Sequence, residues 1–227
     1  MQLNNRVVIF ANGTLPDLKA ARALLDPDDF IVAADGGVHH VSALGLVPAV
    51  VIGDMDSIKE SQMRALSRPR GSRTGNAGIR ILRHPRNKDR TDLELALNYA
   101  QEKSCSSILV LGAFGGRLDQ TLANLALLTD PALQEVDIRL DDGIEEAFFV
   151  SRMREVHGRP GDLVSLLPWG KPVQGVTTQG LKWPLHGEIL YPYRTRGISN
   201  EMAGEVASVR VRSGPLLVVH RRKGISE

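Results

Sequence analysis

Four apolar runs of this chain lead into aspartate, whose carboxylate can bind metal ions and move protons. In chain order, the acids that follow these runs are Asp35; Asp54 and Asp56; Asp89 and Asp92; and Asp119. Parallel strands of an α/β protein bring their carboxyl ends to one edge of the sheet, where ligands bind. Carboxylates gathered there repel each other by about 4 kcal/mol per pair, at about 4 Å and an effective dielectric of about 20. The sequence therefore predicts a divalent cation among these acids.

The sharpest local signal is the segment 53–57, with the sequence GDMDS. If this segment is extended, Asp54 and Asp56 point to the same side. Two carboxylates on one side suit Mg²⁺, which prefers oxygen ligands and usually keeps water and substrate phosphates as its other ligands. A turn rich in Asp and Ser that caps the following helix explains the same residues. On this segment alone, both interpretations stay open.

Asp89 and Asp92 lie on either side of Thr91, which together with Glu94 has the pattern of a capping box at a helix start. Acids in the first turn of a helix are favoured by its dipole whatever their function. Asp92 is nevertheless expected on the same sheet edge as the GDMDS segment. That shared position favours a functional role for Asp92.

A glycine-rich turn, GAFGGRLD at 112–119, lies between a predicted strand and a predicted helix. Glycines let a phosphate approach the backbone, and a helix start offers free N–H donors. The turn is not the dinucleotide fingerprint, and the chain contains no G-x-x-x-x-G-K-S/T loop. A nucleotide is therefore expected to bind differently here than in the common NTPases. The segments DGG at 35–37 and Asn12-Gly13 are weaker signs that point to the same edge.

The elements that must position these residues alternate between Arg6 and about Ser151. Strands are expected at 7–10, 30–34, 50–52, 79–82, 108–111, 138–140 and 147–150. Helices are expected at 16–25, 38–44, 57–66 and 118–128, with one more that starts at Thr91. Continuous apolar strands that alternate with helices predict a parallel sheet covered on both faces.

After Ser151 the helical periodicity ends. Short β-like segments at 163–167, 173–178, 206–211 and 216–220 are separated by Gly, Pro and Asn. This pattern is typical of a small antiparallel β module. The sequence therefore predicts an α/β domain at 1–151 and a β domain at 152–227.

Composition excludes several classes of protein. With 28 basic and 26 acidic residues the 227-residue chain has a net charge of +2, so nothing argues for a nucleic-acid partner. Cys105 is the only cysteine, which excludes a disulfide within the chain and a cysteine-based zinc site. The amino terminus lacks the shape of a signal peptide, and no apolar run approaches about 20 residues. A cytoplasmic protein that does not enter membranes is expected.

Six stretches, taken together and in this order, resemble the thiamin pyrophosphokinase family. They are DGG at 35–37, GDMDS at 53–57, KDRTD at 88–92, GGRLD at 115–119 with LAN at 122–124, GVTT at 175–178 with GLKW at 180–183, and ISN at 198–200. Each stretch is weak alone, but their order and spacing are specific, and they span most of the chain.

The resemblance implies a homodimer whose Rossmann-like α/β domain carries Mg-ATP and whose smaller domain is an antiparallel β-sandwich. Thiamin would lie in a cleft between subunits. In the family, acids that match Asp54, Asp56 and Asp92 hold Mg²⁺ and polyphosphate, and a pair that matches Ser199 and Asn200 helps to bind thiamin from the partner subunit. The remaining matches are assigned to ATP: Asp35, Gly36, Lys88, Asp89, Thr91, Gly115, Gly116, Arg117 and Gln120.

The activity that the resemblance implies is diphosphoryl transfer, in which the hydroxyl of thiamin attacks the β-phosphorus of ATP and AMP leaves. Asp119 also matches a family site position, and either Asp92 or Asp119 would orient or deprotonate the hydroxyl. Arg117 and Lys88 are candidate counter-ions for the transferred group. One departure is Gln120, where many bacterial members have His and others have Gln.

Two alternatives remain at this point. One is a related diphosphokinase that acts on a hydroxymethyl pterin, since archaeal enzymes of that kind share related acidic motifs on a similar scaffold. The other is a non-catalytic protein that binds a nucleotide or a vitamin. Formation of AMP excludes the second alternative, and formation of thiamin diphosphate excludes the first.

Overall fold

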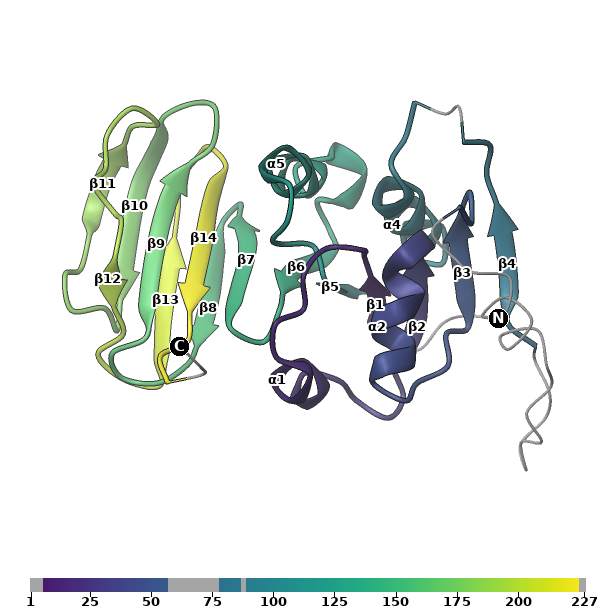
Figure 1. Ribbon diagram of the computed structural model, residues 1–227. Coiled ribbons are helices and arrows are strands. Elements are labelled where there is room, and N and C mark those ends of the chain that lie inside the picture. Colours follow the sequence, from purple (N-terminus) through teal and green to yellow (C-terminus); the bar gives the residue numbers. More distant parts are fainter. Residues whose placement is uncertain (1–5, 57–77, 87–88, 225–227) are drawn as a thin grey trace. The chain divides into compact units, whose positions relative to one another are not determined.

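The computed structural model describes residues 6–56, 78–86 and 89–224, and its contacts divide the chain into two units (Figure 1). Unit 1 is Met1–Gly143 and unit 2 is Ile144–Glu227. The division falls before the predicted boundary at 151, because β7 (Glu145–Val150) pairs antiparallel with β14 (Leu216–Arg221) of unit 2. The helix expected at 57–66 lies outside the described residues.

Unit 1 contains a parallel sheet with the strand order β6-β5-β1-β2-β3-β4. The strands are β1 (Arg6–Phe10), β2 (Phe30–Ala34), β3 (Val50–Gly53), β4 (Arg80–Arg83), β5 (Ser107–Leu111) and β6 (Asp137–Asp141). Their residues are almost all apolar and buried, as strands covered on both faces must be. The exceptions are β4, an edge strand whose end residues Arg80 and Arg83 are exposed, and β6, which contains Asp137, Arg139 and Asp141.

Short helices connect these strands: α1 (Leu18–Ala23), α2 (Val38–Ala43), α4 (Asp92–Glu102), α5 (Leu118–Leu127), and the 3-10 helices η1 (Asp35–Gly37) and η2 (Pro131–Leu133). The side chain of Asp17 caps α1 through the N–H groups of Lys19 and Ala20. Helix α2 packs against β1 and β2, and α4 packs against β1, β2 and β3. None of the helices among the described residues is long and apolar enough to cross a membrane.

Helix α5 forms where its leucines predict it, but those leucines do not share one environment. Leu125 and Leu128 are buried, whereas Leu118 is 73% exposed and Leu122 is 48% exposed. Only the end of the helix therefore packs its leucines into the core.

Unit 2 is a β-sandwich of two antiparallel sheets. One contains β12 (Asn200–Glu201), β9 (Leu163–Pro168), β14 and β7, and the other contains β11 (His186–Leu190), β10 (Val173–Gln179), β13 (Val206–Arg210) and β8 (Met153–His157). Apolar residues of both sheets, such as Leu166 and Val218 from one and Val176 and Val209 from the other, form one buried core. The four strands expected from the sequence form, and β8, β11 and β12 are additional.

Candidate active site

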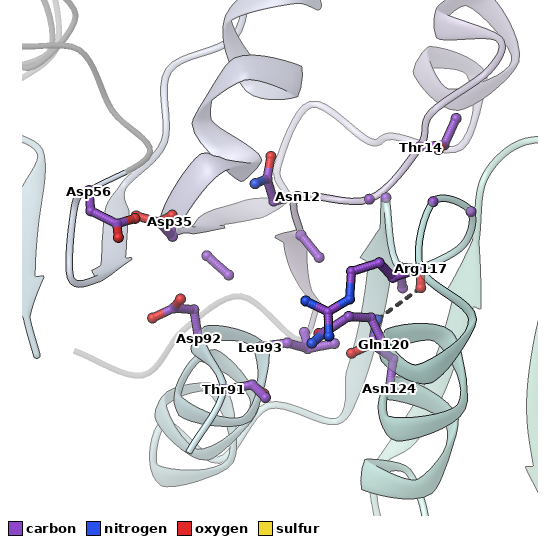
Figure 2. A pocket seen from close by; sticks show the side chains of 17 residues that line it. Asn12, Thr14, Asp35, Asp56, Thr91, Asp92, Leu93, Arg117, Gln120 and Asn124 are labelled. Carbon is purple, nitrogen blue, oxygen red and sulfur yellow. Dashed lines mark hydrogen bonds between the residues drawn. The ribbon is translucent and has the colours of Figure 1, made fainter. Parts of the chain in front are cut away.

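A cavity of about 620 Å³ lies at the carboxyl ends of the strands of unit 1. It is lined by Ala11, Asn12, Gly13, Thr14, Ala34, Asp35, Asp56, Thr91, Asp92, Leu93, Gly112, Ala113, Gly115, Gly116, Arg117, Gln120 and Asn124 (Figure 2). The chain runs from β1 through β2 and β3 to β4 on one side, and then returns to β5 on the other side of β1. Open α/β sheets bind ligands at such a reversal of strand order.

Three aspartates come together at one end of this cavity. Carboxylate oxygens of Asp35, Asp54 and Asp56 lie within 4.8 Å of one another, close enough to ligate one ion. We call these three residues the acid group. Asp35 follows β2, while Asp54 and Asp56 follow the neighbouring strand β3. Oxygen-only ligands of this kind suit a hard cation such as Mg²⁺.

The backbone at the acid group is strained and is held by a hydrogen bond. Asp35 has φ 42° and Met55 has φ 68°, values that residues with a side chain rarely adopt. The buried carboxylate of Asp35 accepts a hydrogen bond of 3.1 Å from the N–H of Met55, which ties the two loops together. Strain of this kind persists where the surrounding structure enforces it, typically at functional sites.

Asp92 lines the same cavity at the start of α4, but it does not belong to the acid group, whose carboxylate oxygens lie within 4.8 Å of one another. A Cβ added to Gly53 would lie 3.1 Å from Asp92 Oδ1 and 2.9 Å from Asp35 Cβ, so the two acids flank this glycine. Thr91 caps α4 by accepting a hydrogen bond of 3.2 Å from the N–H of Glu94, which confirms the Thr91 half of the expected capping box. The cap therefore fixes the backbone at the start of α4, where Asp92 is the first residue.

The acid group is only partly closed off from solvent. The guanidinium of Arg86 lies 3.1 Å from Asp56, yet the Arg86 side chain is 83% exposed and that of Asp56 is 43% exposed. The N–H of Asp56 also donates to Asp54 Oδ1 over 3.0 Å. An ion pair this exposed contributes at most about 1 kcal/mol. Asp54, Asp56 and Asp92 also make interactions beyond these.

The glycine-rich turn forms the other end of the cavity. Gly115 and Gly116 have φ 76° and 70°, a left-handed backbone that favours glycine, and both line the cavity. Within the described part of the chain, nothing accepts a hydrogen bond from the N–H groups of these two glycines. A side chain at Gly115 would also collide with Thr14 Oγ1, 2.4 Å from the added Cβ. The turn thus has the shape of an anion-binding loop.

Arg117 points toward this cavity, but Asp119 does not line it. Instead the carboxylate of Asp119 accepts a hydrogen bond of 3.0 Å from Arg117 Nε. This bond is the main reason why the pKa of Asp119 lies below its usual range and the pKa of Arg117 above its own. Gln120, next in the chain, lines the cavity directly.

Two described residues assigned to ATP from the sequence, Gly36 and Asp89, are not part of the cavity wall. Gly36 is buried beneath Asn12, and Asp89 is exposed outside the lining. Lys88 lies outside the described residues. Asp35, assigned to ATP rather than to the metal, belongs to the acid group in the structure.

Three polar lining residues, Asn12, Thr14 and Asn124, were given no role from the sequence, although Asn12 was expected at this edge. Asn12 follows β1, and Asn124 comes from α5 and is 8% exposed. Asn124 Nδ2 donates to the carbonyl of Ala113 over 2.9 Å and so steadies the glycine-rich turn (Figure 2). The available sequence signal for Asn124 was its place in the LAN stretch at 122–124.

Unit 2 has its own pocket, of about 290 Å³, next to the two residues assigned to thiamin. It is lined by Trp183, Leu185, Arg196, Gly197, Ile198, Ser199 and Asn200. The buried amide of Asn200 is occupied inside the protein, because Oδ1 accepts from the N–H of Trp183 over 3.1 Å and Nδ2 donates to the Trp183 carbonyl over 2.7 Å. Ser199 is exposed and has φ 56°. Asn200 thus holds Trp183 in place at the pocket.

Comparisons with known proteins match both units. Residues 21–140 match the family model described as thiamin pyrophosphokinase, catalytic domain, and residues 152–216 match thiamin pyrophosphokinase, vitamin B1 binding domain. The thiamine pyrophosphokinase of Bacillus subtilis is 27% identical over 207 residues, which cover 90% of this chain and 92% of that protein. Thiamine pyrophosphokinase 1 of rice is 30% identical over 202 residues, 78% of this chain and 73% of the rice protein.

Solved structures share the fold over almost the whole chain. The crystal structure of the Bacillus subtilis protein superposes with a TM-score of 0.83 at 24% identity, covering 96% of this chain and 99% of that one. A family protein from Enterococcus faecalis gives a TM-score of 0.77 at 26% identity, covering 95% and 98% of the two chains. The comparison confirms the expected fold class, an α/β domain with a mostly parallel sheet followed by an antiparallel β-sandwich.

Proposed function

The chain belongs to the thiamin pyrophosphokinase family, and we propose that the cavity of unit 1 is where it carries out the family reaction. The enzyme transfers the diphosphoryl group of ATP to thiamin, giving thiamin diphosphate and AMP. The hydroxyl oxygen of thiamin bonds to the β-phosphorus, the bond from that phosphorus to the α–β bridging oxygen breaks, and the hydroxyl proton is lost. The observation that carries the proposal is the acid group at one end of a cavity whose other end is an anion-binding turn.

The residues present fit a magnesium ion. Asp35, Asp54 and Asp56 offer carboxylate oxygens close enough to share one ion, and Asp92 stands beside them to ligate it directly or through water. When bound, the ion would neutralise polyphosphate charge during the transfer. This assignment keeps Asp54, Asp56 and Asp92 as proposed from the sequence and adds Asp35.

The chain's own residues bind and orient the polyphosphate. The N–H groups of Gly115 and Gly116, which have no acceptor among the described residues, can donate to phosphate oxygens, and the Arg117 guanidinium adds a positive charge beside them. Asp119 holds that guanidinium by its hydrogen bond and so acts through Arg117. Positioning and charge neutralisation supply most of the rate in phosphoryl transfers, because the protein itself forms no covalent bond to the substrate.

Asp92 is the carboxylate we propose for orienting the thiamin hydroxyl and accepting its proton. It lines the cavity directly, which Asp119 does not. It also lies in the first turn of α4, where the helix dipole favours a negative charge.

The β-sandwich is the proposed thiamin-binding unit, supported by its match to the vitamin B1 binding model. Ser199 and the wall formed by Trp183 and Asn200 would contact the vitamin. We further propose a homodimer in which the partner subunit supplies this surface. Light scattering should then give twice the chain mass of 24.8 kDa. A cytoplasmic location suits an enzyme that consumes ATP, and cell fractionation tests it.

The decisive experiment is incubation with MgCl₂, ATP and thiamin, followed by chromatography. We expect thiamin diphosphate and AMP in equal amounts. ADP in place of AMP would mean transfer of a single phosphoryl group and would overturn the proposed chemistry. A hydroxymethyl pterin as acceptor should give no product, since the match through residues 152–216 disfavours the pterin alternative.

A further inference from the structure

Asn12 occupies a distinctive place in the cavity of unit 1. It follows the carboxyl end of β1, the strand at which the strand order reverses. Figure 2 shows its side chain between Asp35, Asp56 and Asp92 on one side and Arg117, Gln120 and Asn124 on the other. It therefore stands between the proposed metal end and the anion-binding turn, where a bound triphosphate would have to pass.

The amide of Asn12 is available to a ligand. In the described part of the structure, no residue forms a hydrogen bond with its side chain, and the residue is exposed to the cavity. Because an amide carries two N–H donors without a charge, it can bond a phosphate oxygen while standing next to carboxylates. A lysine there would compete with a metal ion for the acids, and an aspartate would repel the phosphate.

Gly36 explains how Asn12 is held. A Cβ added at Gly36 would lie 2.4 Å from Asn12 Cγ and Oδ1 and 2.5 Å from Nδ2, distances that no real contact reaches. The amide therefore rests directly on the backbone of Gly36. The neighbouring Gly37 has a different reason, because its Cβ would strike the carbonyl of Phe10 at 1.9 Å. The DGG segment thus provides Asp35 to the acid group and a seat for Asn12.

We propose that Asn12 contacts the substrate in the transfer step, its amide donating a hydrogen bond to a polyphosphate oxygen of ATP, and that Gly36 is glycine so that this amide can be seated. The inference rests on the proposed function, because it takes the occupant of the cavity to be ATP. It also gives Gly36 a positioning role, since Gly36 itself does not line the cavity.

A double-mutant cycle tests this coupling. Asn12→Ala removes the donor and should lower kcat/KM for ATP by about 10- to 100-fold, the range for a hydrogen bond to a charged group. Gly36→Ala should cause a similar loss by displacing the amide. The double variant should be no worse than Asn12→Ala within about twofold, because the two changes remove the same contact. Losses that multiply, or an Asn12→Ala enzyme within about threefold of the wild type, would overturn the proposal.

Asn12→Asp is the matched control for packing. It keeps the size of the side chain against Gly36 but loses the donor and adds a negative charge. A merely structural role would leave this variant near wild-type activity, whereas the proposed contact predicts a loss larger than that of Asn12→Ala. The KM for thiamin should stay unchanged in all variants, and thermal unfolding identifies any that fail to fold.

Binding of α,β-methylene ATP in MgCl₂, measured by calorimetry, separates this inference from the proposed function. If the wild type binds the analogue but releases no AMP from ATP, the proposed function is contradicted. The Asn12 contact is then still supported if Asn12→Asp weakens binding of the analogue. Wild type that makes thiamin diphosphate while Asn12→Asp binds the analogue equally well would contradict the contact alone.

Discussion

Unit 2 contains a second group of acidic side chains, and it contrasts with the acid group of unit 1. His220 lies between Glu146 and Asp162, with Nδ1 2.9 Å from Glu146 Oε1 and Nε2 3.2 Å from Asp162 Oδ2. We call these three residues the histidine triad. All three are buried, and His220 is 0% exposed. His220 thus contacts both carboxylates at once, one through each ring nitrogen.

Gly158 packs directly against the histidine triad. A Cβ at Gly158 would lie 2.6 Å from Asp162 Oδ2 and 2.8 Å from His220 Nε2. The second oxygen of Asp162 accepts a hydrogen bond of 2.8 Å from the N–H of Lys223. The acids of unit 2 are therefore bonded to side-chain and backbone groups of their own unit. The acid group of unit 1 instead adjoins a cavity, so its counter-charge can arrive and leave with the substrate.

The comparison shows two ways in which a protein can offset the repulsion within a cluster of carboxylates. A buried cluster needs hydrogen-bond partners fixed within the fold, because removing charges from water costs several kcal/mol per ion. A cluster at an open cavity can be partly screened by water and by an exposed partner such as Arg86 until a metal ion binds. The first serves stability, and the second serves chemistry.

The largest expected effect comes from removing divalent metal. Excess EDTA should abolish formation of thiamin diphosphate, and MgCl₂ should restore it, because the acid group then lacks the charge that its substrate requires. Circular dichroism should show the fold intact, since water screens this group. Unfolding by EDTA would contradict the distinction between the two acid groups.

Next in size is the loss of His220. His220→Gln removes a ring nitrogen partner from each of two buried carboxylates and should lower the free energy of unfolding by about 3 kcal/mol. Urea denaturation measures this loss. The KM for ATP should be unchanged in the folded fraction, because the ATP cavity belongs to unit 1. A loss below about 1 kcal/mol would mean that the triad contributes little to stability.

Asp56→Asn should lower activity and leave stability intact, the reverse of the result expected for the His220 variant. The variant keeps the side-chain shape but removes a metal ligand, so kcat should fall by about 100- to 1,000-fold. Stability should hold or rise slightly, because repulsion within the acid group is relieved. Asp92→Asn should behave alike. Near-normal turnover in both variants would remove these residues from the mechanism, and steady-state kinetics with thermal unfolding decides the question.

Acid should act on the histidine triad at Asp162. Burial raises the pKa of Asp162, but the N–H groups of Lys223 and Arg159 and the side chain of His220 together hold it below its usual range. Stability from this group is therefore complete above the ordinary aspartate pKa of about 3.9 and is lost as the pH falls further. Asp162→Asn should flatten this acid limb in urea titrations at successive pH values.

Glu188→Gln is the exposed control for that titration. A hydrogen bond from Arg196 lowers the pKa of Glu188 too, but the pair lies at the surface. Its removal should change the acid limb by less than the Asp162 variant does, because solvent screens the pair. An equal change in both variants would show that burial of the triad does not matter.

The smallest effect is expected at Asp119. Asp119→Asn loses the ion pair with Arg117 but keeps a hydrogen-bond acceptor, so the KM for ATP should rise by no more than about tenfold. Arg117→Met should raise the same KM further. A fall in kcat of about 100-fold in Asp119→Asn would instead assign Asp119 a direct catalytic role, which initial-rate measurements would detect.

Much of this arrangement could be read from the sequence. Long apolar strands such as β1 and β5 require burial on both faces, and that alone predicts the parallel sheet and the edge at which its loops meet. The capping pattern at Thr91 fixed the start of α4. The β segments of unit 2 followed from alternation and turn residues.

Other features depend on contacts between distant segments. β7 reads as one more strand of the α/β pattern, yet it pairs with β14, some seventy positions later in the chain, as Phe148 opposite Val218 illustrates. The seat of Asn12 on Gly36 and the bond from Met55 to Asp35 join loops that no local pattern connects. His220 meets Glu146 and Asp162 across 74 and 58 positions of sequence.

By itself the sequence determined which residues carry charge, which segments must be buried and, through six ordered motifs, the family. Only the tertiary structure decided that Asp35 rather than Asp92 completes the group of three, that Asp119 turns to Arg117, and that Asn12 faces the cavity. The physical reason is the distance along the chain over which each interaction acts. Burial and helix capping act between neighbours in the chain, whereas the meeting of carboxylates depends on how separate loops fold back onto one edge.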